Sequence, residues 1–127
     1  MRKITNGIVL MLIVVVFEIS LAGLLPAADF NTFFLAFKAA VARNDAKAVA
    51  GMTQLPFLFD GRRDSSDFQK IYPQLFDANV RTCFAKAKPV TEQDAQVVNC
   101  GRYIFYFRVV QDRYRFIEFS ADPEAVQ

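Results

Sequence analysis

The sequence predicts an α+β domain in which N-terminal helices pack on one face of a small antiparallel sheet, after a signal peptide. Two patterns lead to this fold class. Apolar residues recur at helical spacing through much of residues 30–87, whereas residues 97–121 are rich in aromatic residues and alternate between apolar and polar positions, as strands do. The helices come first and the strands last, and this order favours an antiparallel sheet.

The N-terminal segment has the layout of a secretory signal peptide. Two basic residues are followed by a run of ten apolar residues at 8–17 and then by small residues. We expect residues 1–28 to be the signal peptide and 29–127 the single domain, since 127 residues suffice for one domain and not two. Small residues place the cleavage after Ala22 or near Ala27 and Ala28. The alternative is an uncleaved helix that tethers the protein to a membrane.

Two cysteines, Cys83 and Cys100, both lie beyond the signal segment. In an oxidising compartment such a pair is expected to form one disulfide, which would close a loop of about 16 residues and contribute on the order of 3 kcal/mol to stability. Two buried free thiols are the alternative. A zinc site is not expected, because the sequence has no histidine and only these two thiols.

The first two helices follow from an aromatic stripe and from capping residues. Asp29 or Asn31 can cap a helix whose stripe recurs at the i, i+3, i+4 and i+7 positions. An Asn-Asp step at 44–45 ends this helix and caps a shorter one over residues 46–53. We expect the stripe to pack in the core. It consists of Phe30, Phe33, Phe34, Phe37 and Val41.

Two further helices are expected after an extended stretch at 55–59 and a polar loop at 60–66. Ser66 or Asp67 should cap the third helix, and Pro73 should break or kink it. The fourth helix is expected from about residue 77 to residue 87. Residues 88–94 then form a linker or a poorly ordered edge strand.

Residues 97–121 are expected to form a pair of strands joined by a three-residue loop at 111–113. In this register one face is nearly all apolar, and it pairs Tyr103 with Ala121, Phe105 with Phe119 and Phe107 with Ile117. The other face pairs Arg102 with Asp122, Tyr106 with Glu118 and Arg108 with Phe116. A shift by one residue would bring Arg108 opposite Arg115, so burial and cross-strand repulsion both oppose that shift.

The aromatic and charged face of this hairpin is the candidate binding site. It comprises Arg102, Tyr106, Arg108, Phe116 and Glu118. Tyrosine and arginine are enriched in protein interfaces, and an aromatic patch with charges at its rim has the composition of such an interface. The alternatives are an exposed sheet face without function and a face covered by residues 55–59.

The sequence lacks the groups that the commonest catalytic sites need. The absence of histidine removes the most frequent general base and metal ligand, and no phosphate-binding loop or nucleophile elbow is present. We therefore expect no catalysis, no cofactor and no metal. A carboxylate could still act as a base, and Glu118 opposite Tyr106 is the pair that the register brings together. A polar cross-strand contact is the simpler interpretation.

Several motifs resemble those of small exported proteins with a nuclear-transport-factor-two-like or cystatin-like fold. The run FKAAVARNDAKAVAGMTQLPF at 37–57 is similar to the opening of such proteins, and the segments NCGRYIFYF and YRFIEF follow in a similar order. The resemblance implies helices against a cone-shaped antiparallel sheet. The class contains isomerases, dehydratases and non-catalytic binding modules, so the resemblance implies no single function. No catalytic residue of the class is matched by motif.

We expect an exported, non-catalytic binding module that acts in the periplasm or after secretion through a protein or small-molecule contact, with a homodimer left open. A net charge of +2 does not favour nucleic acid, and a membrane contact is expected only through an uncleaved signal segment. Two alternatives remain. One is a small isomerase- or hydratase-like enzyme with a carboxylate–tyrosine site at Asp60 or Glu118, and the other is an immunity-type inhibitor of a hydrolase or toxin.

Overall fold

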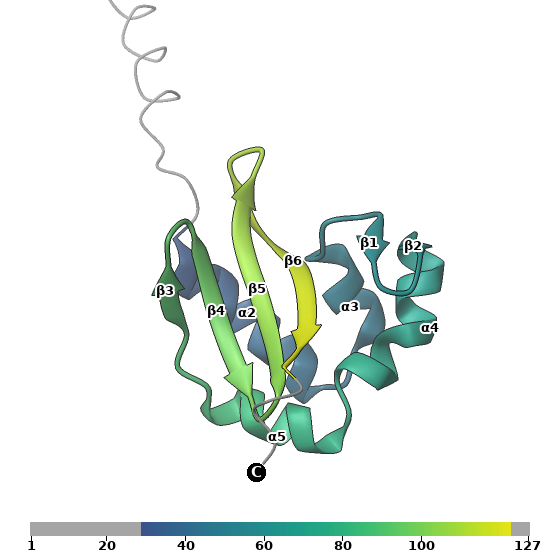
Figure 1. Cartoon of the computed structure of the whole chain (residues 1–127), viewed down its shortest axis with the longest axis horizontal. Coiled ribbons are helices and arrows are strands. Elements are labelled where there is room, and N and C mark those ends of the chain that lie inside the picture. Colours follow the sequence, from purple (N-terminus) through teal and green to yellow (C-terminus); the bar gives the residue numbers. More distant parts are fainter. Residues whose placement is uncertain (1–28, 123–127) are drawn as a thin grey trace, which may run out of the picture.

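The chain folds as helices followed by an antiparallel sheet, which confirms the α+β class. The structure is a computed structural model that describes residues 29–122. The expected signal peptide, residues 1–28, lies outside the described residues. In Figure 1 the sheet faces the viewer, α2 (Phe30–Ala42) crosses behind it, and the other helices lie beside and below it.

The described residues contain four helices, at the positions that the hydrophobic periodicity predicts. The first, α2, is followed by α3 (Ala46–Gly51), α4 (Ser65–Leu75) and α5 (Ala78–Lys86). Pro73 does not break α4, so the first of the two expected effects, a break or a kink, is wrong. It lies in the last turn, so the missing N–H costs the helix one backbone bond shortly before it ends. The predicted stripe on α2 faces the core, since Phe30, Phe34, Phe37 and Val41 are buried and Phe33 is partly buried against them.

Aspartate side chains cap three of these helices. In each case the carboxylate accepts a hydrogen bond from the backbone N–H three residues further on, at 2.8–3.0 Å. The prediction of Ser66 or Asp67 as the cap of α4 is wrong, because Asp64 occupies that position and binds the N–H of Asp67. The three caps are Asp45 for α3, Asp64 for α4 and Asp77 for α5.

The sheet has four strands in the order β3-β4-β5-β6. They are β3 (Val90–Glu92), β4 (Ala95–Cys100), β5 (Tyr103–Val110) and β6 (Arg113–Ala121), each antiparallel to its neighbour. The predicted hairpin is present as β5 and β6, but residues 97–100 belong to a separate strand, β4, so the prediction of only two strands in residues 97–121 is wrong. The chain turns at Gly101, whose φ of +65° suits glycine, and this turn separates β4 from β5.

The turn between β5 and β6 has two residues, not the predicted three. Gln111 and Asp112 both have positive φ, at 51° and 67°, and Val110 pairs directly with Arg113. Two residues with positive φ give a turn of the I′ kind, whose twist matches that of the strands on either side. The shorter turn shifts the register of the hairpin tip by one residue.

A β-bulge restores the predicted register in the lower half of the hairpin. Ile117 is the extra residue, because Tyr106 pairs with Glu118 whereas the next residue of β5, Phe107, pairs with Phe116. Below the bulge the predicted partners of Tyr103, Phe105 and Tyr106 are confirmed, and above it the predicted partners of Phe107 and Arg108 are wrong. The bulge turns Phe116 toward the helices, on the same side as Phe119, while Glu118 stays on the other face.

Phenylalanine side chains fill the space between the helices and the sheet. The ring of Phe37 on α2 lies 5.0 Å from that of Phe107 on β5, and both residues are fully buried. Phe116 lies at the centre of this core, with ring centroids 5.0–6.4 Å from those of Phe37, Phe57, Phe68, Phe76, Phe105 and Phe107. Each such burial contributes roughly 1.5–3 kcal/mol, so this aromatic core is a principal source of stability.

The segment after α3 protects the edge of β6. The backbone N–H and C=O of Phe116 bond to Met52 and Gln54, at 2.9 and 2.8 Å. Beyond this segment, β1 (Phe57–Leu58) and β2 (Arg62–Arg63) form a short hairpin, and the ring of Phe57 packs in the core. Residues 55–59 therefore lie on the helix side and do not cover the opposite face of the sheet, which removes one alternative for that face.

Candidate functional site

One face of the sheet has no helix packed against it, and we call it the outer sheet face. Successive strand residues point to opposite faces, and Val98, Phe105 and Phe107 belong to the core. Residues of the other parity therefore lie on the face that Figure 1 presents to the viewer. The outer sheet face consists of Val90, Val97, Ile104, Tyr106, Arg108 and Glu118.

The centre of the outer sheet face is apolar. Val97 is only 1% exposed although it is not part of the core beneath the helices, because it lies between its cross-strand neighbours Val90 and Tyr106. Tyr106 and Ile104 are half-buried, and the Val90 side chain is 52% exposed. A tyrosine with aliphatic neighbours thus forms a small apolar patch that solvent reaches.

Charged groups of both signs surround this patch. Arg108 Nε donates to Asp94 Oδ1 at 3.2 Å, and Glu118 is exposed opposite Tyr106. Arg108 also lies opposite Arg115, the pairing that cross-strand repulsion disfavours. The structure separates the two guanidinium groups, because Arg115 turns around the sheet edge and its Nη1 donates to the Gly51 carbonyl at 2.6 Å.

An open depression of about 450 Å³ adjoins Tyr106 and Arg108 on the outer sheet face. Its other borders come from the β3–β4 hairpin, namely Glu92, Gln93 and Ala95. The depression therefore offers an aromatic wall, a guanidinium and a carboxylate within one surface hollow. Such a hollow can receive a side chain of a partner more readily than a flat sheet can.

Two of the five predicted site residues do not belong to the outer sheet face. Phe116 is fully buried in the core, because the bulge at Ile117 reverses the side to which it points. Arg102 lies in the turn between β4 and β5, where its guanidinium is 5.8 Å from the centre of the Tyr103 ring. Tyr106, Arg108 and Glu118 do share the predicted face. Ile104 and Val97 were missed, although strand alternation alone places Ile104 beside Tyr106.

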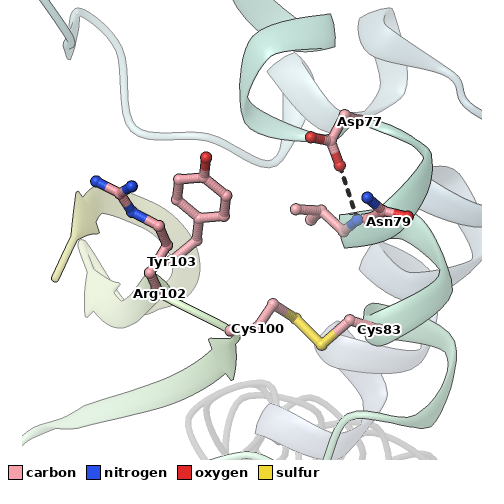
Figure 2. A pocket seen from close by; sticks show the side chains of 8 residues that line it. Asp77, Asn79, Cys83, Cys100, Arg102 and Tyr103 are labelled. Atoms are coloured by element: carbon pink, nitrogen blue, oxygen red, sulfur yellow. Dashed lines mark hydrogen bonds between the residues drawn. A yellow bond between two sulfur atoms is a disulfide. The ribbon is translucent and has the colours of Figure 1, made fainter. Parts of the chain in front are cut away.

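Arg102 instead borders a pocket of about 350 Å³ at the other end of the sheet. Figure 2 shows Arg102 and Tyr103 on the strand side of this pocket, Asp77 and Asn79 on the helix side, and the disulfide linking the two sides. The Asp77 carboxylate is engaged as the cap of α5 through the N–H of Val80, at 2.9 Å. The pocket is therefore a gap between a helix start and a turn, held at a fixed width by the disulfide.

Cys83 and Cys100 form the predicted disulfide, with Cα atoms 5.8 Å apart. It ties α5 to the end of β4, and no free cysteine remains in the described residues. A bond of this kind is compatible with a location outside the cytoplasm, since intracellular thiols are usually kept reduced.

The carboxylates that could have served a catalytic pair are exposed. Asp60 lies in the β1–β2 turn and Glu118 on the outer sheet face, and neither is enclosed in a cavity beside a tyrosine. Thr53 is the one buried polar residue among residues 29–122, and its hydroxyl bonds to the Val49 carbonyl at 2.7 Å. In the same part of the chain no three histidine, cysteine or acidic side chains gather as a metal site.

Within residues 29–122, every helix is too short or too polar to span a bilayer. Comparison of the chain with protein-family models, with curated proteins and with solved structures yields no match.

Proposed function

We propose that the protein is an exported binding module that recognises a partner protein through the outer sheet face, without catalysis. The observation that carries this proposal is the one-sided covering of the sheet. Helices bury one face, whereas the other presents Tyr106, Ile104 and Val90 with Arg108 and Glu118 around them. Interfaces of protein complexes combine a tyrosine- and arginine-rich centre with a polar rim in the same way.

The charges of the outer sheet face favour a protein over a polyanion. A face that binds nucleic acid or an anionic membrane collects lysine and arginine of one sign. Here Arg108 is already paired with Asp94, while Glu92 and Glu118 add negative charge. A partner with a mixed surface can match this pattern, and the hollow beside Tyr106 can receive one of its side chains.

Export is supported by two independent features. The N-terminal sequence has the layout of a signal peptide, and the Cys83–Cys100 disulfide is of the kind that persists in the periplasm or after secretion. The order of the elements along the chain, with the helices first and the antiparallel sheet last, also supports the proposed likeness to the nuclear-transport-factor-two-like or cystatin-like class. That class includes non-catalytic binding modules, consistent with the solvent-exposed positions of Asp60 and Glu118.

Capture of the partner from an extract of the compartment in which the protein accumulates tests the proposal. We expect the Tyr106→Ala/Arg108→Ala variant to lose the captured protein, because truncation of a central interface residue costs about 2 kcal/mol, or roughly thirtyfold in affinity. Light scattering on the purified protein separates a foreign partner from a second copy of the chain. A self-associated protein whose dimer the same variant dissolves would identify the partner as another copy.

A matched control removes one apolar and one arginine side chain elsewhere. Leu58 and Arg62 are exposed cross-strand partners on the small β1–β2 hairpin, which lies beyond the β6 edge of the sheet and not in front of the outer sheet face (Figure 1). The Leu58→Ala/Arg62→Ala variant should retain the partner. If the Tyr106/Arg108 variant is folded and still captures its partner as well as the parent does, the outer sheet face is not the binding surface.

A further inference from the structure

A second surface pocket lies on the helix side of the sheet edge, apart from the outer sheet face. It has a volume of about 260 Å³ and is formed where α2 and the end of α3 meet the start of β6. Its apolar lining comes from Phe33 and Ala36 of α2, from Met52 and from the Tyr114 ring. Arg113 and Arg115 flank Tyr114 at the strand end of the pocket.

Neither arginine has an acidic partner among the residues that the structure describes. The ion pairs within residues 29–122 involve Arg43, Lys70 and Arg108, and neither Arg113 nor Arg115 takes part in one. One N–H of Arg115 is used by the Gly51 carbonyl, which fixes the guanidinium at the pocket and leaves its other N–H groups available. Two guanidinium groups thus lie beside an apolar lining, and no carboxylate of residues 29–122 pairs with them.

The surroundings of Arg115 disfavour its positive charge. Burial lowers the pKa of its guanidinium, and the positive charge of Arg113 lowers that pKa further. Both effects mean that the cationic form is less stable here than in water. A bound anion would offset both, and a carboxylate accepts two parallel hydrogen bonds from one guanidinium with good geometry.

We infer that this pocket binds a small organic anion with an apolar body. Its carboxylate would lie between Arg113 and Arg115, and its hydrocarbon part would contact Phe33, Ala36 and Met52. The volume falls below the roughly 300–1,000 Å³ of pockets that hold drug-sized ligands, so the ligand class is a medium-chain or aryl carboxylate. This site does not depend on the partner-binding function of the outer sheet face.

Titration of the isotopically labelled protein, produced from the complete sequence, with octanoate tests the inference by NMR. We expect saturable shift changes at Phe33, Ala36, Met52 and residues 113–115, all below the micelle concentration of octanoate. Octanol has the same chain without the charge and should bind about tenfold more weakly or worse, because a charge-assisted bond contributes about 1.5–3 kcal/mol. Octylammonium should bind no better than octanol.

Substitutions in the pocket show whether octanoate binding depends on the arginine charges or only on the apolar lining. Arg113→Gln should weaken octanoate binding about tenfold, and it removes no hydrogen bond or ion pair within the described residues. Arg115→Gln should do the same but also loses the bond to Gly51. Ala36→Leu places a larger side chain in the pocket and should abolish binding, whereas Arg62→Gln on the distant β1–β2 hairpin should have no effect.

Three results would overturn the inference. The first is the absence of saturable shifts around the pocket in a protein whose spectrum shows it folded. The second is equal binding of octanoate and octanol, which would make the pocket apolar without selecting an anion. The third is unchanged octanoate binding in Arg113→Gln.

Discussion

Tyr72 on α4 carries a hydroxyl group that is buried without a hydrogen-bond partner in the described structure. The ring itself is well placed, with its centre 5.0 Å from that of Phe76 and only 1% of the residue exposed. A buried hydroxyl that has lost water and gained no partner costs about 1–3 kcal/mol. At this residue the aromatic core is therefore less favourable than a core with phenylalanine in the same place would be.

We predict that Tyr72→Phe raises the free energy of unfolding by about 1 kcal/mol, because it removes the unpaired hydroxyl and keeps the ring. Urea denaturation at neutral pH measures this. Tyr106→Phe makes the same chemical change on the outer sheet face, and we expect it to alter stability by less than about 0.5 kcal/mol. A Tyr72→Phe variant less stable than the parent would show that the hydroxyl has a favourable partner.

The same hydroxyl gives stability a dependence on alkaline pH. Burial raises the pKa of Tyr72; the charge of Arg81 opposes this shift and the charge of Asp45 adds to it. Because the folded-state pKa lies above the ordinary value of 10.0, the unfolded chain loses this proton first as pH rises. Below about pH 10 Tyr72 is protonated in both states and does not make the free energy of unfolding depend on pH. As pH rises from there through the folded-state pKa, the free energy of unfolding falls.

Alkaline denaturation of the two proteins checks the sign of this effect. Between about pH 9 and pH 11 the parent should lose more stability than Tyr72→Phe does, since the variant has no proton to lose at this site. Parallel loss of stability in both proteins over this range would mean that Tyr72 does not titrate differently in the folded and unfolded states.

The first residues of two helices, α2 and α4, differ in how an aspartate side chain meets the free backbone N–H groups. The side chain of Asp64 accepts the N–H of Asp67 at the start of α4, at 2.8 Å, whereas Asp29 at the start of α2 makes no such side-chain bond. The two aspartates occupy the same helix position in the same extended backbone conformation. Substitution of each aspartate therefore compares the contribution to stability of a capping hydrogen bond with that of a negative charge that makes no such bond.

We predict that Asp64→Ala lowers the free energy of unfolding by about 1 kcal/mol, because an N–H at the start of α4 loses its acceptor. Asp29→Ala removes only a charge near the start of α2 and should cost less than about 0.5 kcal/mol. Thermal or urea unfolding of both variants measures the difference. Equal losses would show that the capping bond adds nothing beyond the charge.

The helices could be predicted from the sequence because their signals are local. Hydrophobic spacing within about ten residues identified each helix, and Asp45 as a cap could be recognised from its position alone. The position of Pro73 in the last turn of α4 could not, because the packing of Phe68, Ile71, Tyr72 and Leu75 carries that helix past the proline.

The sequence predicted that the last part of the chain forms an antiparallel sheet, but it did not predict the full register of the strands. Register depends on the geometry of the turns. Asp112 is of a residue type that tolerates positive φ, but Gln111 is not, so two consecutive positive φ angles could not be expected here. The bulge at Ile117 adjoins Phe116, whose backbone bonds to Met52 and Gln54, and these residues are distant in sequence. Residues 97–121 also contain Gly101, and a glycine within a strand pattern is a signal for a turn that could have been used.

At the scale of the whole molecule, the aromatic core leaves one face of the sheet uncovered. Alternation along β5 correctly assigned Tyr106 and Arg108 to a common face, because side-chain parity along a single strand is a local property. It could not assign Phe116, since the bulge lies on the neighbouring strand. The anion pocket was not predictable either, because it brings together Phe33, Met52 and Arg115 from three separate elements.

If the outer sheet face contacts a partner protein, a crosslinking side chain placed on that face should capture this partner. A benzophenone side chain in place of Tyr106 keeps an aromatic group at the centre of the face, and the same group in place of the exposed Leu58 is the control. When cells that produce each protein are irradiated, the benzophenone at position 106 should give one discrete adduct with a partner protein. The benzophenone at position 58 should give none. Equal adducts at both positions, or none at position 106, would contradict the claim.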